Sequence, residues 1–189
     1  MGPLLDIILS LVVRGTIVLA VLNVTVTLQG KLSEKTAQVN EFTLVNTVAA
    51  ILRQDLDKTG YNMAGPPYIS VASTDTIEVC YNAVPPPAYP GGIATKVKFY
   101  TGPKSELSST VNPDDRILYK SVNGGSPIVV AKGITTLKFA YYNSSGSTTS
   151  NTLYITSFSV DLIMKGPDKI NNIYPAAEWN TRLAPFGMR

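Results

Sequence analysis

The feature that most constrains the fold is a long apolar run near the start of the chain, residues 3–30. This stretch, "PLLDIILSLVVRGTIVLAVLNVTVTLQG", carries only two charges, Asp6 and Arg14, and the next charge is Lys31. As an α-helix, residues 7–28 would extend about 33 Å, enough to cross the hydrocarbon core of a bilayer. The run is therefore a cleaved signal, a membrane anchor, or a surface that packs against copies of itself.

A cleaved secretory signal is the weakest of these interpretations. Such a signal has basic residues before a short apolar core and a small-x-small cleavage site. Here no Lys or Arg precedes the run, and the run is longer. An anchor fits the length, but a charge inside a membrane span costs about 2.5–3.5 kcal/mol on insertion scales. We expect Asp6 and Arg14, about two turns apart and too distant to bond within one helix, either to pair between chains or to extend to one headgroup layer.

After Gly30 the pattern becomes that of an amphipathic helix. Apolar residues recur at spacings of three and four, at Leu32, Val39, Phe42, Val45, Val48 or Ala49, Leu52 and Leu56. The segment "DKTGYN" is a stop signal, with Gly60 where a left-handed C-cap would fall. The sequence therefore predicts one helix from about residue 4 to residue 59, with Gly15 and Gly30 as the positions where it could break.

Beyond Gly60 the apolar period becomes two, which indicates β-strands. Strands are predicted at 68–73, 75–82, 94–102, 114–122, 126–133, 134–143 and 151–165, with a short one near 179–183. Residues 73–75 and 123–125 are predicted tight turns, and the Pro/Gly-rich residues 84–92 a loop. We therefore predict an α+β fold in which the long N-terminal helix packs on an antiparallel sheet. Residues 1–30 would be the apolar half of the helix, and residues 31–189 a globular head made of helix 31–59 and the sheet.

Residue usage argues against catalysis and metal binding. The chain has no histidine, which excludes His-containing triads and His-ligated metal sites. The close carboxylate pairs are Asp55/Asp57, on different sides of a helix, and Asp114/Asp115, in a turn without the spacing of a calcium loop. We predict no catalytic residue, no cofactor and no metal site, and an enzyme is the least favoured class.

Charge and cysteine usage narrow the partners further. The net charge of +3 comes without a Lys/Arg cluster, so we predict no nucleic-acid partner. The single cysteine, Cys80, excludes an intrachain disulfide and is expected to be a partly buried strand residue.

Three stretches give the chain a resemblance to a protein family. They are "AILRQDLDKTGYNM" at 50–63, "RILYKSVNGGSPIVVAKGITTLKFAYYNSSG" at 116–146 and "TRLAPFGMR" at 181–189. Together with the half-apolar helix, they make the chain similar to type IV pilin-like proteins, in particular minor pilins and pseudopilins of the W and J type.

The resemblance implies a structural subunit of an extracellular pilus-like filament. Its partners would be copies of itself or other pilins, and it would reside in the inner membrane before assembly and on the cell surface afterwards. Asp6 takes the place of the family's early acid, which meets the N-terminal amine of a neighbouring subunit. The family's basic leader is missing before Asp6, so we expect either a mature chain or unconventional processing.

Two alternatives and one modification stay open. The chain could be a minor pseudopilin of a secretion machine, or a membrane-anchored β-rich binding module. For the module, the candidate surface comprises loop 84–92 and the tyrosines Tyr81, Tyr89, Tyr100, Tyr141, Tyr142 and Tyr154. Asn143, in an Asn-Ser-Ser triplet, is a candidate N-glycosylation site, whereas the triplet at Asn23 lies inside the apolar helix.

Overall fold

A computed structural model describes residues 2–83, 94–167, 169, 170 and 172–188. The elements are α1 (Gly2–Leu56), β1 (Ile69–Ala72), β2 (Thr76–Tyr81), β3 (Thr95–Thr101), η1 (Lys104–Leu107), β4 (Arg116–Val122), β5 (Ile128–Tyr142), β6 (Ser157–Lys165), β7 (Ala176–Leu183) and η2 (Phe186–Met188). The chain divides into two compact units, Met1–Val39 and Asn40–Arg189. We call the first the stem and the second the head, and describe each by itself.

The predicted single long helix is confirmed. α1 comprises 55 residues, and neither Gly15 nor Gly30 interrupts it. A Cβ atom added at either glycine would meet nothing within 4 Å, so close packing does not explain them. The helix ends at Leu56, and a turn then leads to Gly60, whose φ of 75° is the left-handed conformation expected of a C-cap glycine.

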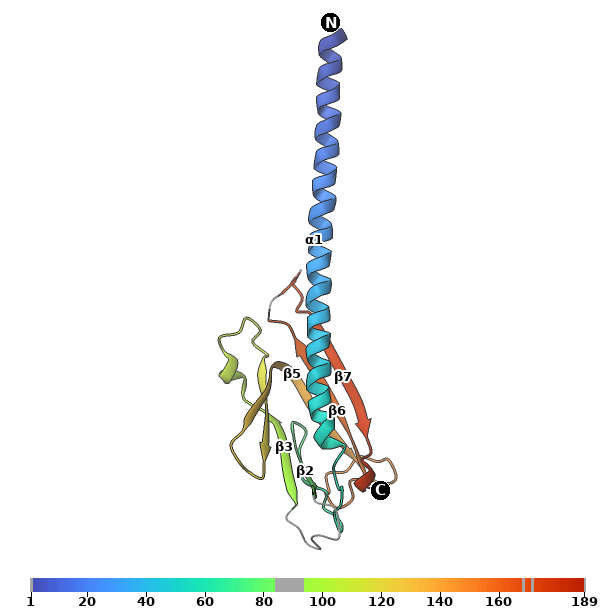
Figure 1. Cartoon of the computed structure of the whole chain (residues 1–189), viewed down its shortest axis with the longest axis vertical. Helices are drawn as coiled ribbons and strands as arrows, with labels where there is room; N and C mark the ends of the chain where they lie inside the picture. The colour runs from blue at the N-terminus through green and yellow to red at the C-terminus, as the bar shows by residue number, and fades with distance from the viewer. Residues whose placement is uncertain (1, 84–93, 168, 171, 189) are drawn as a thin grey trace. The chain divides into compact units, whose positions relative to one another are not determined.

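The head contains one antiparallel sheet of seven strands in the order β1-β2-β3-β4-β5-β6-β7. Every strand therefore pairs with its neighbours in sequence, and the predicted antiparallel sheet is confirmed. Figure 1 shows the C-terminal turns of α1, coloured teal, lying across one face of this sheet.

The core of the head lies between α1 and that face. Val45, Val48, Leu52 and Leu56 are buried at the spacing of three and four that the sequence predicts. The largest side chains that the sheet contributes, all fully buried, are Ile69, Ile77, Phe99, Leu118, Ile134, Phe158, Leu162 and Met164. Burial of this apolar surface is the main free-energy term that holds helix and sheet together.

The predicted apolar stripe is not buried along its full length. Phe42 is 59% exposed, and Leu32 and Val39 are exposed as well. Helical periodicity identifies the apolar side of a helix, but it does not show how far a partner surface extends. Burial in α1 becomes continuous on this side only from Val45 onward.

Two predicted strand boundaries are wrong for local reasons. Residues 126–133 and 134–143 form one strand, β5, because Gly133 takes a φ of 81° and a bulge follows between Ile134 and Thr136. The strand predicted to begin at residue 151 begins at Ser157, because Asn151 forms a turn that Leu153 N and Tyr154 N close by donating to its side chain and carbonyl.

Candidate functional site

The large apolar side chains that the structure describes in the first part of the stem face outward in the single chain. From Ile7 to Leu28 their large hydrophobic side chains are between 51% and 69% exposed. α1 is long and apolar enough to cross a membrane, and no residue of its most apolar 18-residue stretch is buried. An exposed apolar surface of this kind is typical of segments that lipid or other helices cover.

The threonine hydroxyls of the apolar run are satisfied within the helix. Thr16, Thr25 and Thr27 each donate a hydrogen bond of 2.6–2.8 Å to the main-chain carbonyl four residues earlier. Such bonds allow threonine to enter an apolar environment without an unpaired donor. The strongly polar side chains that remain along the apolar run are Asp6, Arg14 and the amides of Asn23 and Gln29.

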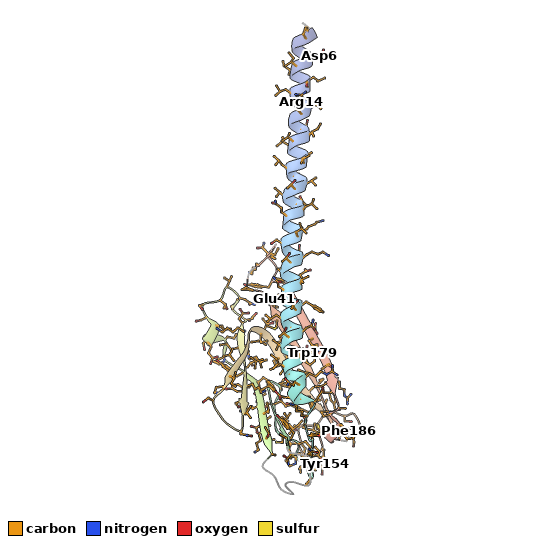
Figure 2. The ribbon with its side chains drawn as sticks, in the orientation of Figure 1. Asp6, Arg14, Glu41, Tyr154, Trp179 and Phe186 are labelled. Atoms are coloured by element: carbon orange, nitrogen blue, oxygen red, sulfur yellow. The ribbon has the colours of Figure 1, made fainter. Side chains whose placement is uncertain are left out.

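Asp6 and Arg14 are both exposed and do not form an ion pair with each other in the described part of the chain. Figure 2 shows them on separate turns of α1. Eight residues of helix separate their Cα atoms by about 12 Å along the axis and by about 80° around it. Both charges therefore remain free to meet groups of another chain.

The two candidate carboxylate pairs diverge. Asp55 is buried, whereas Asp57 is exposed. Asp57 accepts a hydrogen bond of 3.1 Å from Arg53. Asp114 is exposed and its hydrogen bond from Lys104 lowers its pKa. Burial raises the pKa of Asp115.

Glu41 of α1 is near enough to the buried Asp115 for the two carboxylates to interact electrostatically. Burial and the charge of Asp115 both raise the pKa of Glu41. No group of three or more His, Cys, Asp or Glu side chains among the described residues could hold a metal ion. Glu41 thus carries a charge of the same sign as Asp115 under partial burial, and both effects shift its pKa upward.

Most of the candidate tyrosines serve packing. Tyr81 and Tyr141 are buried, and the Tyr141 hydroxyl donates to the Ser73 carbonyl at 2.8 Å. Tyr100 stacks on Tyr119 with ring centroids 5.4 Å apart. Tyr154 is exposed, and loop 84–92 with Tyr89 lies outside the described residues.

Tyr142 has a partner that the sequence pattern did not predict. The guanidinium of Arg182, on β7, lies 4.1 Å from the centre of the Tyr142 ring. The register of β6 and β7, which pairs Ser159 with Arg182, brings these residues together from positions far apart in the sequence. Periodicity alone gives no signal for such a contact.

Asn143 organises the turn after β5. Its side-chain oxygen accepts bonds from Ser145 N at 3.1 Å, Ser145 Oγ at 2.7 Å and Ser147 N at 3.0 Å. Glycosylation at this residue stays a prediction. Cys80 is free and lies in β2, as predicted, but it is buried, at 4% exposure, where the sequence predicted partial burial.

One long apolar helix followed by an antiparallel sheet that its second half packs on is the fold of type IV pilin-like proteins. The chain is similar in structure to a type IV-like pilin from Thermus thermophilus, with a TM-score of 0.52 and 10% sequence identity. The match covers 77% of this chain and 96% of the other, and it confirms the predicted fold. No protein-family model matches the chain, and no curated protein matches it in sequence.

Proposed function

We propose that the chain is a structural subunit of an extracellular pilus-like filament, assembled through its apolar N-terminal helix. The observation that carries the proposal is the stem: its apolar side chains are exposed all round, while the same helix continues into a folded pilin-like head. A helix that is apolar on every side is stable in lipid or among like helices.

The proposed route begins in the inner membrane and ends at the cell surface. Before assembly the stem serves as an anchor. During assembly it exchanges lipid for the stems of neighbouring subunits, and a heterologous contact that does not close generates a filament. The partners are copies of this chain or other pilins, with no nucleic acid involved.

Asp6 and Arg14 are the proposed registration points of this assembly. In a bundle of stems each charge is removed from water, and an unmatched buried charge costs several kcal/mol. Pairing Asp6 of one subunit with Arg14 of a neighbour removes that cost at one axial offset, and pairing it with the neighbour's N-terminal amine does so at another. Whichever cation is the partner, the ion pair favours the offset that brings the two groups together.

The proposal assigns no catalysis to the chain. A pilin-like head and the absence of histidine from the sequence favour a structural role. A minor pseudopilin of a secretion machine has the same fold and differs in abundance within the assembly, so the decisive experiment must measure abundance.

The test is electron microscopy of material sheared from cells that express the full chain, with mass spectrometry of the same fraction. We expect filaments in which this chain is the most abundant protein. Recovery of the chain only with inner membranes, and no filaments, would contradict the proposal and favour a pseudopilin or an anchored binding module.

A further inference from the structure

An open hollow of about 580 Å³ lies on the head beside the turn that follows β5. Its polar lining comes from that turn, from β6 and the residue before it, and from β7: Asn143, Ser144, Ser145, Thr156, Ser157 and Arg182. Five of these side chains offer a hydroxyl or an amide, and one offers a positive charge. The hollow does not include any part of the stem.

Arg182 is held in place at this hollow. Its guanidinium stacks over the ring of Tyr142 at 4.1 Å, and its Nη2 and Nε donate to Ser157 Oγ at 2.9 and 3.3 Å. A stacked guanidinium with two of its five N–H groups engaged keeps the other donors in a fixed direction. Little side-chain entropy is then lost when a ligand binds.

The residues that line the hollow include no Asp or Glu. By strand register, Asp161 lies two residues along β6 from Ser159, the cross-strand partner of Arg182. Among the described side chains, Arg182 makes no ion pair. Other cations of the head have such partners, for example Lys120 with Asp55 and Lys104 with Asp114. A fixed, uncompensated guanidinium is suited to a carboxylate or another oxyanion, which it binds through two parallel hydrogen bonds.

The surroundings of Arg182 add hydroxyl recognition and aromatic surface. Two exposed aromatic side chains lie two residues from lining residues in the sequence, although they do not line the hollow themselves: Tyr154, 64% exposed, and Phe186, 81% exposed. Figure 2 places both at the same end of the head. Serine, threonine and asparagine groups bind the hydroxyls of a sugar, and exposed aromatic rings cover its apolar faces.

We propose that the Arg182 hollow is a binding site for an acidic saccharide, a sugar that carries a carboxylate. The carboxylate pairs with Arg182, and the ring hydroxyls contact the Asn143–Ser145 turn and Thr156. The site belongs to the head and does not depend on the proposed filament.

The test is calorimetric titration of the full chain in polyoxyethylene detergent, which has no sugar headgroup, at low ionic strength. The chain is produced in a host without N-glycosylation, so that Asn143 is unmodified. The probe is trigalacturonic acid, with neutral maltotriose and inorganic sulfate as comparisons. We expect saturable binding of trigalacturonic acid, at least about tenfold tighter than of either comparison.

The variants separate this site from general charge attraction. R182Q is expected to weaken binding about tenfold or more, and R182K to restore little of it, because an ammonium lacks the planar fork. S157A, which removes the anchor of the guanidinium, is expected to weaken binding to a smaller extent. K132Q removes an exposed charge of the same sign from β5 and is expected to bind like the wild type.

Three outcomes would overturn the proposal: no saturable binding by the wild type, equal affinity for sulfate, or R182Q binding as tightly as K132Q. Fluorescence of the single tryptophan, Trp179, verifies that each variant is folded. If R182Q does not fold, S157A carries the test, and unchanged affinity in S157A contradicts the site.

Discussion

Asp55 of α1 and Lys120 of β4 form an ion pair of 2.6 Å, with side chains only 7% and 25% exposed. The second cation near Asp55, Lys58, is 4.0 Å away and largely exposed. Lys120 is thus the main counter-ion of the Asp55 carboxylate, which is buried in the head. Loss of one partner of a buried pair leaves an uncompensated charge.

Lys120→Met is therefore expected to lower the free energy of unfolding by about 3 kcal/mol. Arg53→Ala, which breaks the exposed pair with Asp57, is the matched control and should change it by less than about 0.5 kcal/mol. Both are measured by urea unfolding of the full chain in detergent, followed by Trp179 fluorescence. Equal effects of the two substitutions would contradict the assignment of Lys120.

Gly60 and Gly187 pack backbone against backbone. A Cβ on Gly60 would lie 2.5 Å from the Gly187 carbonyl oxygen, and the φ of Gly60 is already 75°. Gly60→Ala should cost about 2–4 kcal/mol through the clash and the strained φ. Gly65→Ala is the control, since its Cβ would meet nothing within 4 Å. Thermal unfolding curves that coincide for the two variants would argue against this contact.

Leu52 and Phe42 belong to the same predicted apolar stripe but differ in burial. Leu52 is fully buried, so Leu52→Ala should lower the free energy of unfolding by about 2–5 kcal/mol. Phe42 is exposed, so Phe42→Ala should change it by less than about 0.5 kcal/mol. Urea titrations of both variants check the prediction, which fails if Phe42→Ala is the more damaging.

Ionisation of Glu41 should lower the free energy of unfolding of the head as the pH rises. Its pKa is raised above the ordinary value of 4.5 by burial and by Asp115, so the folded state binds its proton more tightly than the unfolded state does. The stabilisation from this proton is complete below pH 4.5 and is lost as the pH rises through the folded-state pKa.

Glu41→Gln replaces the ionisable carboxyl group with a neutral amide. It should raise the melting temperature at pH 7 and leave it nearly unchanged at pH 4. Glu34→Gln, which replaces a glutamate of the stem in the same way, is the matched control and should leave the melting curves of the head like those of the wild type. Melting curves at half-unit steps between pH 4 and pH 7 measure the difference. A variant with the same pH slope as the wild type would remove Glu41 from this account.

Asp6→Ala should abolish filament assembly without changing the head, because a neighbour's cation then enters the bundle unpaired. The exchange of charges, Asp6→Arg with Arg14→Asp, should restore part of the assembly if the two residues meet across subunits. Filament yield after shearing is the measurement, and Trp179 fluorescence in detergent is the control for folding. Normal filaments from Asp6→Ala would show that Asp6 does not set the register.

The helix and the alternating strands were predictable because both rest on local periodicity. The exposure of Phe42 was not, since it depends on where the sheet ends. The merging of two predicted strands into β5 required the positive φ of Gly133, which periodicity does not encode. Arg182 was missed because its contact with Tyr142 follows from strand register.

The strand order of the sheet, in which each strand pairs with the one before it, also bears on how the head folds. Each pairing closes a connection of at most 14 residues, from the short ones at 73–75 and 123–127 to the longest at 102–115 and 143–156. Closing loops of this size costs limited chain entropy and favours rapid formation. The sheet can therefore grow one hairpin at a time, and the docking of α1 onto its apolar face is the step that joins distant parts of the sequence. Substitutions at Val45, Val48 and Leu52 should accordingly accelerate unfolding more than they slow the pairing of the strands.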